Sequence, residues 1–186
     1  MTTEAKFKYA IRELMKTLSI DEITVTILCK KCNCHRQTFY YHYQDIYDLI
    51  ADILLSENLE AFEKSKTIEE ATHQFLLYLK ENFDFYRTTY LSSAKDLPDD
   101  FIYDKLRAKF SSVLSKDRKK YELKKIGECR TVARRFSRVV SDEFGDRLKE
   151  AGANPEKFQR KMNLYLDKAE RILFPAILAM SREEEK

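Results

Sequence analysis

The side chains best suited to chemistry in this sequence lie in the stretch HRQTFYYHY, residues 35–43. Only Phe39, helped by the preceding Cys34, offers apolar surface for burial, so a helix here cannot be a core helix. Arg36 can make a bidentate contact to guanine and Gln37 one to adenine, while Tyr and His at the far end can donate to phosphate oxygens. The residues left outside are Arg36, Gln37, Thr38, Tyr40, Tyr41, His42 and Tyr43. We expect a helix that can enter the major groove of DNA.

Such a helix needs a scaffold, and the neighbouring residues predict one. An apolar stripe at helical spacing predicts a first helix over about 4–18. Thr24 can cap a second helix, which ends at Asn33, a residue that tolerates the left-handed conformation of a tight turn. Asp45 caps the helix after the polar stretch, with Asp48 also at its positive end. Two short helices separated by about four residues form a helix-turn-helix layout.

The composition of the chain favours an all-α protein. Its 186 residues include only three Gly and three Pro, although 44% are hydrophobic, whereas sheet proteins need many turns built from these residues. No run approaches the roughly 20 apolar residues of a membrane span. The charged N-terminus is unlike a signal peptide, and four Cys without an export signal indicate reduced thiols. We therefore expect a cytoplasmic location and no membrane partner.

Helical spacing continues along the rest of the chain. The helix capped by Asp45 extends its stripe toward Phe62, and Thr67 with Glu70 matches a capping box. Residues 95–100 are predicted to be a loop before a helix that begins at Phe101.

The last third predicts two long helices. Gly152 ends the first, and Asn154 followed by Pro155 starts the second. Pro175 should kink or end that second helix. Its apolar stripe is Phe158, Met162, Tyr165, Ala169, Ile172 and Leu173.

Residues 23–50, ITVTILCKKCNCHRQTFYYHYQDIYDLI, resemble the DNA-binding segment of the tetracycline-repressor (TetR) family. The resemblance covers about residues 5–55 in order and spacing. The matching positions are Ile23-Thr24-Val25, Cys29, Cys32, Asn33, Thr38 to Tyr43 and Asp45 to Leu49. It implies an all-helical homodimer with a three-helix DNA-binding domain over 1–47 and a larger effector and dimerisation domain over 48–186. In such proteins the last two helices pair into a four-helix bundle.

The resemblance further implies a transcription regulator that binds a pseudo-palindromic double-stranded operator, as a repressor released by an effector. Family members usually carry Gly where this chain has Asn33 and Gln37, and often a small residue where it has His35. The family pattern directs Arg36, Gln37 and Tyr40 toward bases, and Thr24, Lys30, Tyr41 and His42 toward phosphates. The complete predicted DNA-binding set is Thr24, Lys30, His35, Arg36, Gln37, Thr38, Tyr40, Tyr41 and His42.

Aromatic residues in the centre of the chain are candidates for an effector pocket, because ligand sites are mostly apolar with a few polar groups. The shorter stretch 78–90 resembles the effector domain of TetR proteins linked to dihydroxyacetone-kinase operons. The predicted pocket comprises Phe75, Tyr78, Phe85, Tyr86, Tyr90 and Arg134. Its ligand would be a small molecule or a protein. The alternative for each aromatic residue is ordinary helical core.

The cysteines raise the question of a metal. Cys29, Cys32, Cys34 and His35 are residue types that bind zinc, but the cysteines occupy apolar positions and no second ligand pair follows at finger spacing. We therefore predict core packing and no metal. No nucleophile with a spaced partner and no phosphate-binding glycine loop is present, so we predict neither an enzyme nor a cofactor.

A basic stretch over 116–138 holds ten basic residues against three acidic ones, a net charge of +7. Arg130, Arg134 and Arg138 follow one another at intervals of four, where like charges repel on a helix. The stretch can be a solvated face, or it can bind an anionic effector, an acidic protein or additional DNA. A protein partner held there would make the chain a DNA-binding co-activator, the alternative to a repressor.

Overall fold

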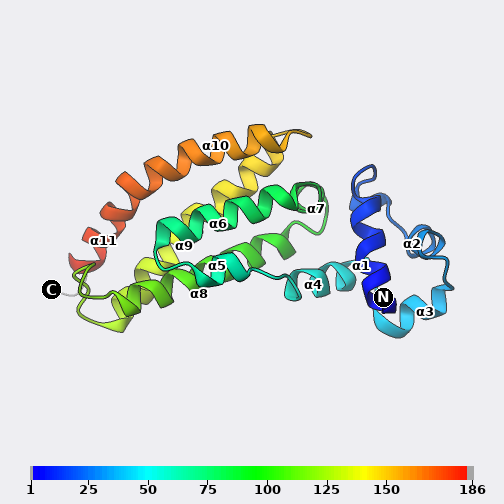
Figure 1. Cartoon of the computed structure of the whole chain (residues 1–186), viewed down its shortest axis with the longest axis horizontal. Coiled ribbons are helices and arrows are strands. Elements are labelled where there is room, and N and C mark those ends of the chain that lie inside the picture. Colours follow the sequence, from blue (N-terminus) through cyan, green and yellow to red (C-terminus); the bar gives the residue numbers. More distant parts are fainter. Residues whose placement is uncertain (1, 184–186) are drawn as a thin grey trace. The chain divides into compact units, whose positions relative to one another are not determined.

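The computed structural model describes residues 2–183, which form helices and no strands (Figure 1). The elements are α1 (Thr3–Leu14), η1 (Ile20–Glu22), α2 (Val25–Cys32), α3 (Arg36–His42), α4 (Ile46–Leu55), α5 (Glu60–Lys64), α6 (Ile68–Glu81), α7 (Phe83–Tyr90), α8 (Asp96–Lys116), α9 (Ile126–Glu150), α10 (Pro155–Lys168), η2 (Ala169–Leu173) and α11 (Phe174–Glu183). The predicted all-α fold class is confirmed. Within this part of the chain, no helix is both long and apolar enough to cross a bilayer.

Packing divides the chain into two compact units. Of the described residues, the N-terminal unit contains 2–58 and 82–98, and the C-terminal unit contains 59–81 and 99–183. The predicted division at 47/48 followed the linear sequence, whereas packing adds α4 and the segment around α7 to the helix-turn-helix. Residues 184–186 of the predicted second domain lie outside the described part of the chain.

The N-terminal unit is built around α1, which packs against α2 and α4. The Phe7 ring meets the Phe39 ring edge to face, with centroids 5.3 Å apart, and both side chains are fully buried. The segment around α7 is attached by hydrogen bonds: Thr88 Oγ1 donates to the Met15 carbonyl at 3.1 Å, and Ser93 Oγ donates to Asp21 Oδ1 at 2.6 Å. A distant part of the sequence therefore helps to hold the helix-turn-helix.

The predicted helix caps are confirmed. Thr24 Oγ1 accepts from the Ile27 N–H at 3.2 Å, and Asp45 Oδ1 accepts from the Asp48 N–H at 2.9 Å. Thr67 Oγ1 accepts from the Glu70 N–H at 3.0 Å. Asn154 caps α10 with Pro155 at its start, and Gly152 takes the left-handed conformation with φ of 64°. Local side-chain chemistry therefore sets these helix ends.

Three helix bounds differ from the prediction. Helix α1 ends at Leu14, and residues 15–17 form turns. The helix that begins at Ile46 stops at Leu55, and Phe62 belongs to the separate helix α5. Helix α8 begins at Asp96 rather than Phe101, because Pro98 falls in its first turn, where the missing N–H costs no hydrogen bond.

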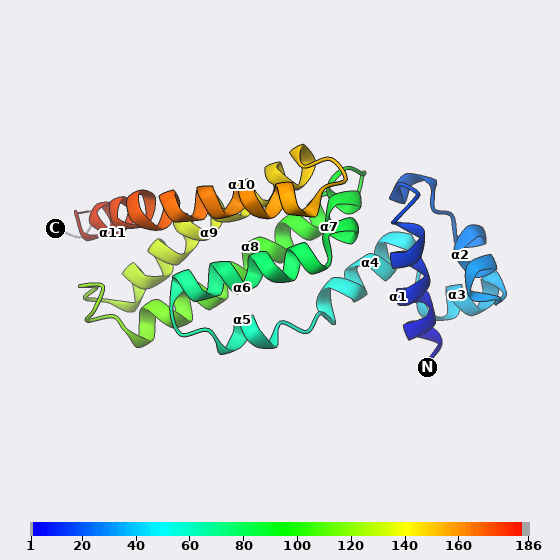
Figure 2. The same ribbon diagram turned by 45° about the horizontal axis from the view of Figure 1, so that its top comes forward.

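The C-terminal unit contains α5, α6, most of α8, and the helices from α9 to α11. Helix α10 packs against both α6 and α9, as Figure 2 shows. Its core is rich in phenylalanine: the Phe75 and Phe144 rings lie 5.9 Å apart, and the Phe110 and Phe136 rings lie 5.5 Å apart. All four side chains are fully buried, so these helices are held by aromatic packing.

A π-turn over η2 joins α10 to α11, and the Phe174 N–H bonds to the Ala169 carbonyl five residues back. Pro175 explains this break, since it has no N–H for the carbonyl four residues earlier. The predicted kink is confirmed in this form. The predicted stripe is wrong at Ile172 and Leu173, which are exposed, because the wider turn rotates the helix face that follows it.

Candidate nucleic-acid interface

The turn between α2 and α3 is fixed by its backbone. Asn33 adopts the left-handed conformation with φ of 51°, and the Cys34 N–H bonds to the Cys29 carbonyl at 3.0 Å. This six-residue closure satisfies a carbonyl at the end of α2 and reverses the chain direction. Asn does here what Gly does elsewhere, at a modest steric cost. Helix α3 therefore starts in a defined direction from α2.

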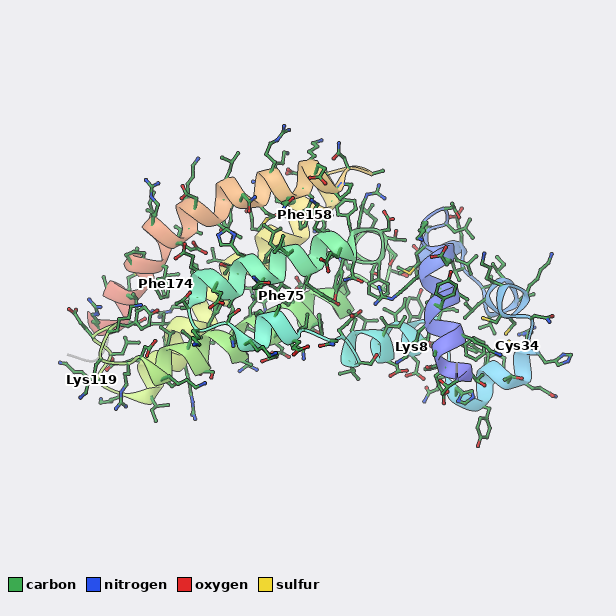
Figure 3. All side chains as sticks on the ribbon, in the orientation of Figure 1. Lys8, Cys34, Phe75, Lys119, Phe158 and Phe174 are labelled. Atoms are coloured by element: carbon green, nitrogen blue, oxygen red, sulfur yellow. The ribbon has the colours of Figure 1, made fainter. Side chains whose placement is uncertain are left out.

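The inner face of α3 is held by two aromatic residues. Phe39 is fully buried against Phe7, as expected, but Tyr43 is buried as well, and the prediction that it faces outward is wrong. The Tyr43 hydroxyl donates to Asp52 Oδ2 at 2.7 Å, and Lys8 Nζ lies 2.8 Å from the same carboxylate. Figure 3 labels Lys8 on α1. These contacts tie the end of α3 to α1 and α4.

The ionisation of this network favours the charged carboxylate. Burial by itself raises the pKa of Asp52, but hydrogen bonds from Lys8 and Tyr43 outweigh it, and the net pKa lies below its ordinary value. Burial, then the bond to Asp52, raises the pKa of Tyr43. At neutral pH the network is a protonated phenol and an ionised carboxylate beside an ammonium group. Sequence reasoning missed Lys8 and Asp52, since only the fold brings them to Tyr43.

The outer face of α3 carries the predicted base-contacting residues. Arg36 and Gln37 are exposed, as is His35 at the N-cap, and Tyr40 keeps 50% of its surface in solvent. The Arg36 guanidinium donates to the Tyr40 hydroxyl at 3.3 Å. The Arg36 and Tyr40 side chains thus lie side by side on the open face of the helix. Their hydrogen-bonding groups are of the types that recognise base edges.

The residues predicted to contact phosphates differ in their solvent exposure and in the contacts that they already make. Tyr41 is 85% exposed, and Lys30 is exposed at the end of α2. The Thr24 hydroxyl is exposed but already caps α2. His42 is half-buried, and its Nδ1 lies 3.1 Å from Glu4 Oε1 on α1. Thr38 is also half-buried. Tyr41 and Lys30 are therefore the most accessible of this group.

The cysteines pack as thiols around the turn. Cys29 Sγ lies 3.8 Å from the His35 carbonyl and Cys32 Sγ lies 3.7 Å from the Lys6 carbonyl, as donors of weak hydrogen bonds. Burial raises the pKa of Cys29 to about 12 and that of Cys32 to about 11. Such thiols stay protonated at neutral pH. Among the described residues, no group of His, Cys, Asp and Glu is arranged to hold a metal.

One further residue connects the parts of the N-terminal unit. The Arg12 guanidinium pairs with Glu57, donates to Asn82 Oδ1 at 3.1 Å and lies 4.4 Å from the centre of the Phe85 ring. It therefore links α1 to the chain after α4 and to α7. Sequence reasoning gave Arg12 no role, since partners so far away in sequence leave no local signal.

The residues predicted for an effector pocket fall in both units. Phe75, Tyr78 and Arg134 belong to the C-terminal unit, whereas Phe85, Tyr86 and Tyr90 belong to the N-terminal unit. Arg134 is exposed, Tyr78 is half-buried and the other four are buried. A pocket of about 480 Å³ lies along α10 and contains none of them. Its lining is Asn154, Glu156, Lys157, Gln159, Arg160, Asn163 and Leu164. The effector pocket stays a prediction.

The described residues form an all-helical fold with a helix-turn-helix near the N-terminus. Among solved structures, one similar chain is described as the dihydroxyacetone kinase operon activator DhaS, with 18% sequence identity and a TM-score of 0.66. The match covers 91% of this chain and 97% of the other. No family model and no curated protein matches the sequence.

A second similar structure is that of a candidate transcriptional regulator from Pseudomonas aeruginosa PAO1. Its sequence identity is 15% and its TM-score is 0.58, and the match covers 94% of this chain and 93% of the other. At these identities, both likenesses show a shared fold. The predicted all-α fold is therefore shared with these two structures over nearly the whole chain.

Proposed function

We propose that this chain is a sequence-specific DNA-binding transcription regulator that reads the major groove with α3. The observation that carries the proposal is the two-sided character of this helix. Phe39 is buried on one side, while Arg36 and Gln37 are exposed on the other. A helix fixed from behind and rich in hydrogen-bonding groups in front can present them to base edges without first being ordered.

The proposed contacts divide by their reach and chemistry. Arg36, Gln37 and Tyr40 face bases, with His35 beside them, and a bidentate contact from Arg to guanine discriminates by about 1–3 kcal/mol. Tyr41 and Lys30 contact phosphates and fix the register of the helix. Thr24, Thr38 and His42 complete the proposed site at its edges.

We also propose that the regulator works as a homodimer. Leu164 and Ile172 are each 63% exposed, and Met180 is exposed as well. One α-turn and one π-turn together span about eight residues, so η2 aligns Ile172 with Leu164. These exposed apolar side chains on α10, η2 and α11 support pairing with a second copy. Two recognition helices about 34–36 Å apart would match successive turns of an operator.

For the sign of regulation, we propose repression relieved by an effector that binds the two states of the dimer unequally. The second candidate is activation together with a protein partner. It is favoured by the similar structure DhaS, which is described as an operon activator. A reporter gene placed behind a selected operator would rise on loss of a repressor and fall on loss of an activator.

The experiment for DNA binding compares variants in a gel shift with a duplex selected from random DNA. Arg36→Ala should weaken binding about tenfold or more, and Tyr41→Phe should weaken it by about threefold, since one removes a base contact and the other a phosphate contact. Lys66→Ala is the matched control, because Lys66 is exposed in the C-terminal unit. Circular dichroism should show that all three variants fold. Unchanged binding by both α3 variants would reject the proposed site.

A further inference from the structure

The basic stretch of the sequence contains a cluster of cations without counter-ions. Among the exposed basic side chains from the end of α8 to the third turn of α9, we call six the basic platform. They are Lys116, Lys119, Lys120, Lys124, Arg130 and Arg134. Figure 3 shows Lys119 in the turn between the two helices. Within residues 2–183, none of the six forms an ion pair.

Most acidic residues of the same segment form contacts with groups outside the platform side chains. Glu122 lies 2.9 Å from Arg182 on α11. Glu128 is buried, and its carboxylate accepts from the Lys124 N–H at 2.8 Å. Within residues 116–134, Asp117 is the remaining acidic side chain, and its single charge is smaller than the summed charge of the six cations.

The platform ends before Arg138, which differs from the other basic residues of α9. The Arg138 guanidinium lies 3.5 Å from Asp99, 3.6 Å from Asp142 and 3.9 Å from the centre of the Tyr103 ring. The predicted stripe of Arg130, Arg134 and Arg138 is therefore not uniform. Its third member is satisfied within the unit, and the first two are left to an outside partner.

The start of α9 carries charges of both signs. Lys124 precedes Lys125, which occupies the N-cap of α9 without a side-chain cap to the first turn. Helix N-termini carry positive partial charge and favour acidic residues, as α4 shows with Asp45 and Asp48. In α9, Glu128 supplies the acidic side chain of the first turn, so it partly offsets the lysines before it.

The platform stands on an ordered scaffold. Glu122 adopts the left-handed conformation with φ of 55°, and the buried Leu123 donates its N–H to the Arg118 carbonyl at 3.0 Å. Arg182 Nη2 donates to the Tyr121 carbonyl at 2.7 Å, and the Tyr121 ring packs edge to face on Phe174 at 5.8 Å. The backbone of the turn is thus held against α11. Binding then costs less ordering of the backbone.

We propose that the basic platform docks an acidic segment of a partner protein. From Ile126 to Arg134 the surface runs about 12 Å along α9, which is longer than one small anion can cover. Ile126 is 52% exposed in the middle of the cations, and nothing lies within 4 Å of the position where Gly127 would carry a Cβ. A phosphate backbone gains nothing from contact with an exposed isoleucine. A peptide that combines acidic and apolar side chains can contact both the cations and Ile126.

The test uses the full chain and two fluorescent peptides of about 16 residues, long enough to cover the platform as a helix. One peptide contains Glu and Leu, and the other replaces each Leu with Gln. The Lys119→Glu/Lys124→Glu variant should bind the Glu–Leu peptide about tenfold more weakly than the parent chain. The Lys66→Glu/Lys95→Glu variant is the control, because it makes the same change in net charge at two exposed lysines elsewhere. It should change binding by less than about twofold.

Ile126→Ser tests the apolar part separately. It should weaken binding of the Glu–Leu peptide by about fivefold and leave binding of the Glu–Gln peptide nearly unchanged, since only Leu gains from contact with Ile126. Equal losses in the two charge-reversal variants, or no effect of Ile126→Ser, would overturn the proposal. So would tighter platform-dependent binding to duplex DNA, or to vesicles that contain phosphatidylserine. This result does not depend on α3, because the platform variants should still bind the operator.

Discussion

Two exposed helical faces of this molecule present opposite chemistry. The outer face of α3 offers Arg36 and Gln37 over a buried aromatic anchor, whereas the outer face of α10 and η2 offers Leu164 and Ile172. The first face matches the donors and acceptors of base edges, and the second matches another apolar surface. Exposure alone therefore does not identify the partner of either face. The kind of side chain left in solvent indicates the kind of partner.

The largest effect is expected from breaking the inner face of α3. Phe39→Ala removes a fully buried ring and leaves a cavity beside Phe7, so the free energy of unfolding should fall by about 3–5 kcal/mol. Tyr41→Ala on the outer face should change it by less than about 0.5 kcal/mol. Urea titration followed by circular dichroism measures both. Equal losses would mean that the two faces of α3 are not distinct.

The next effect concerns the apolar face. Ile172→Asp places a charge in the proposed dimer interface and should raise the dimer dissociation constant about 100-fold, because the buried carboxylate has no partner there. Leu77→Asp is the control, since Leu77 is also exposed but lies on α6. Sedimentation equilibrium measures both. A monomeric parent chain, or a dimer unaffected by Ile172→Asp, would reject the assignment of this face.

A smaller effect should follow from changing the turn before α3. Asn33→Ala forces Ala into a left-handed conformation and should destabilise the chain by about 1 kcal/mol, whereas Asn33→Gly relieves that strain and should be neutral or slightly stabilising. Thermal melts of both variants check the order. If the Asn33→Ala variant were as stable as the Asn33→Gly variant, the turn would not have the left-handed conformation described.

The smallest expected effect is a pH dependence of the free energy of unfolding, which tests the contact between Tyr43 and Asp52 at the end of α3. The folded pKa of Asp52 lies below its ordinary value of 3.8, so its ionised form stabilises the folded state. This contribution is present above pH 3.8 and is lost as the pH falls through the lower folded pKa. The stability of Asp52→Asn should depend less on pH in that acidic window. Parallel acid titrations of unfolding give the comparison, and identical slopes would contradict it.

Much of the helix-turn-helix could be predicted because its signals are local. Thr24, Asn33 and Asp45 act on backbone groups within a few residues, and their types alone indicate where helices begin and end. The exposed character of Arg36 and Gln37 also followed from the scarcity of apolar residues around Phe39. These inferences needed no knowledge of the rest of the chain.

Other features depend on contacts that are distant in sequence. Tyr43 looked exposed because it belongs to a run of polar and aromatic residues, yet its hydroxyl donates to Asp52, whose carboxylate also pairs with Lys8. The attachment of α7 to the N-terminal unit through Thr88 was equally hidden. The exposure of Ile172 required the π-turn, which changes the helical period that the apolar spacing assumes. Periodicity predicts faces only while the period holds.

The central claim is that α3 reads DNA sequence with its outer face, and operator selection tests it most directly. DNA bound by the parent chain and by Gln37→Ala would be selected from the same random library at low salt and sequenced. The account predicts an inverted repeat for the parent chain, and for Gln37→Ala the same repeat with relaxed preference at one base position of each half-site. No enriched sequence for the parent chain, or an identical preference in both, would contradict it.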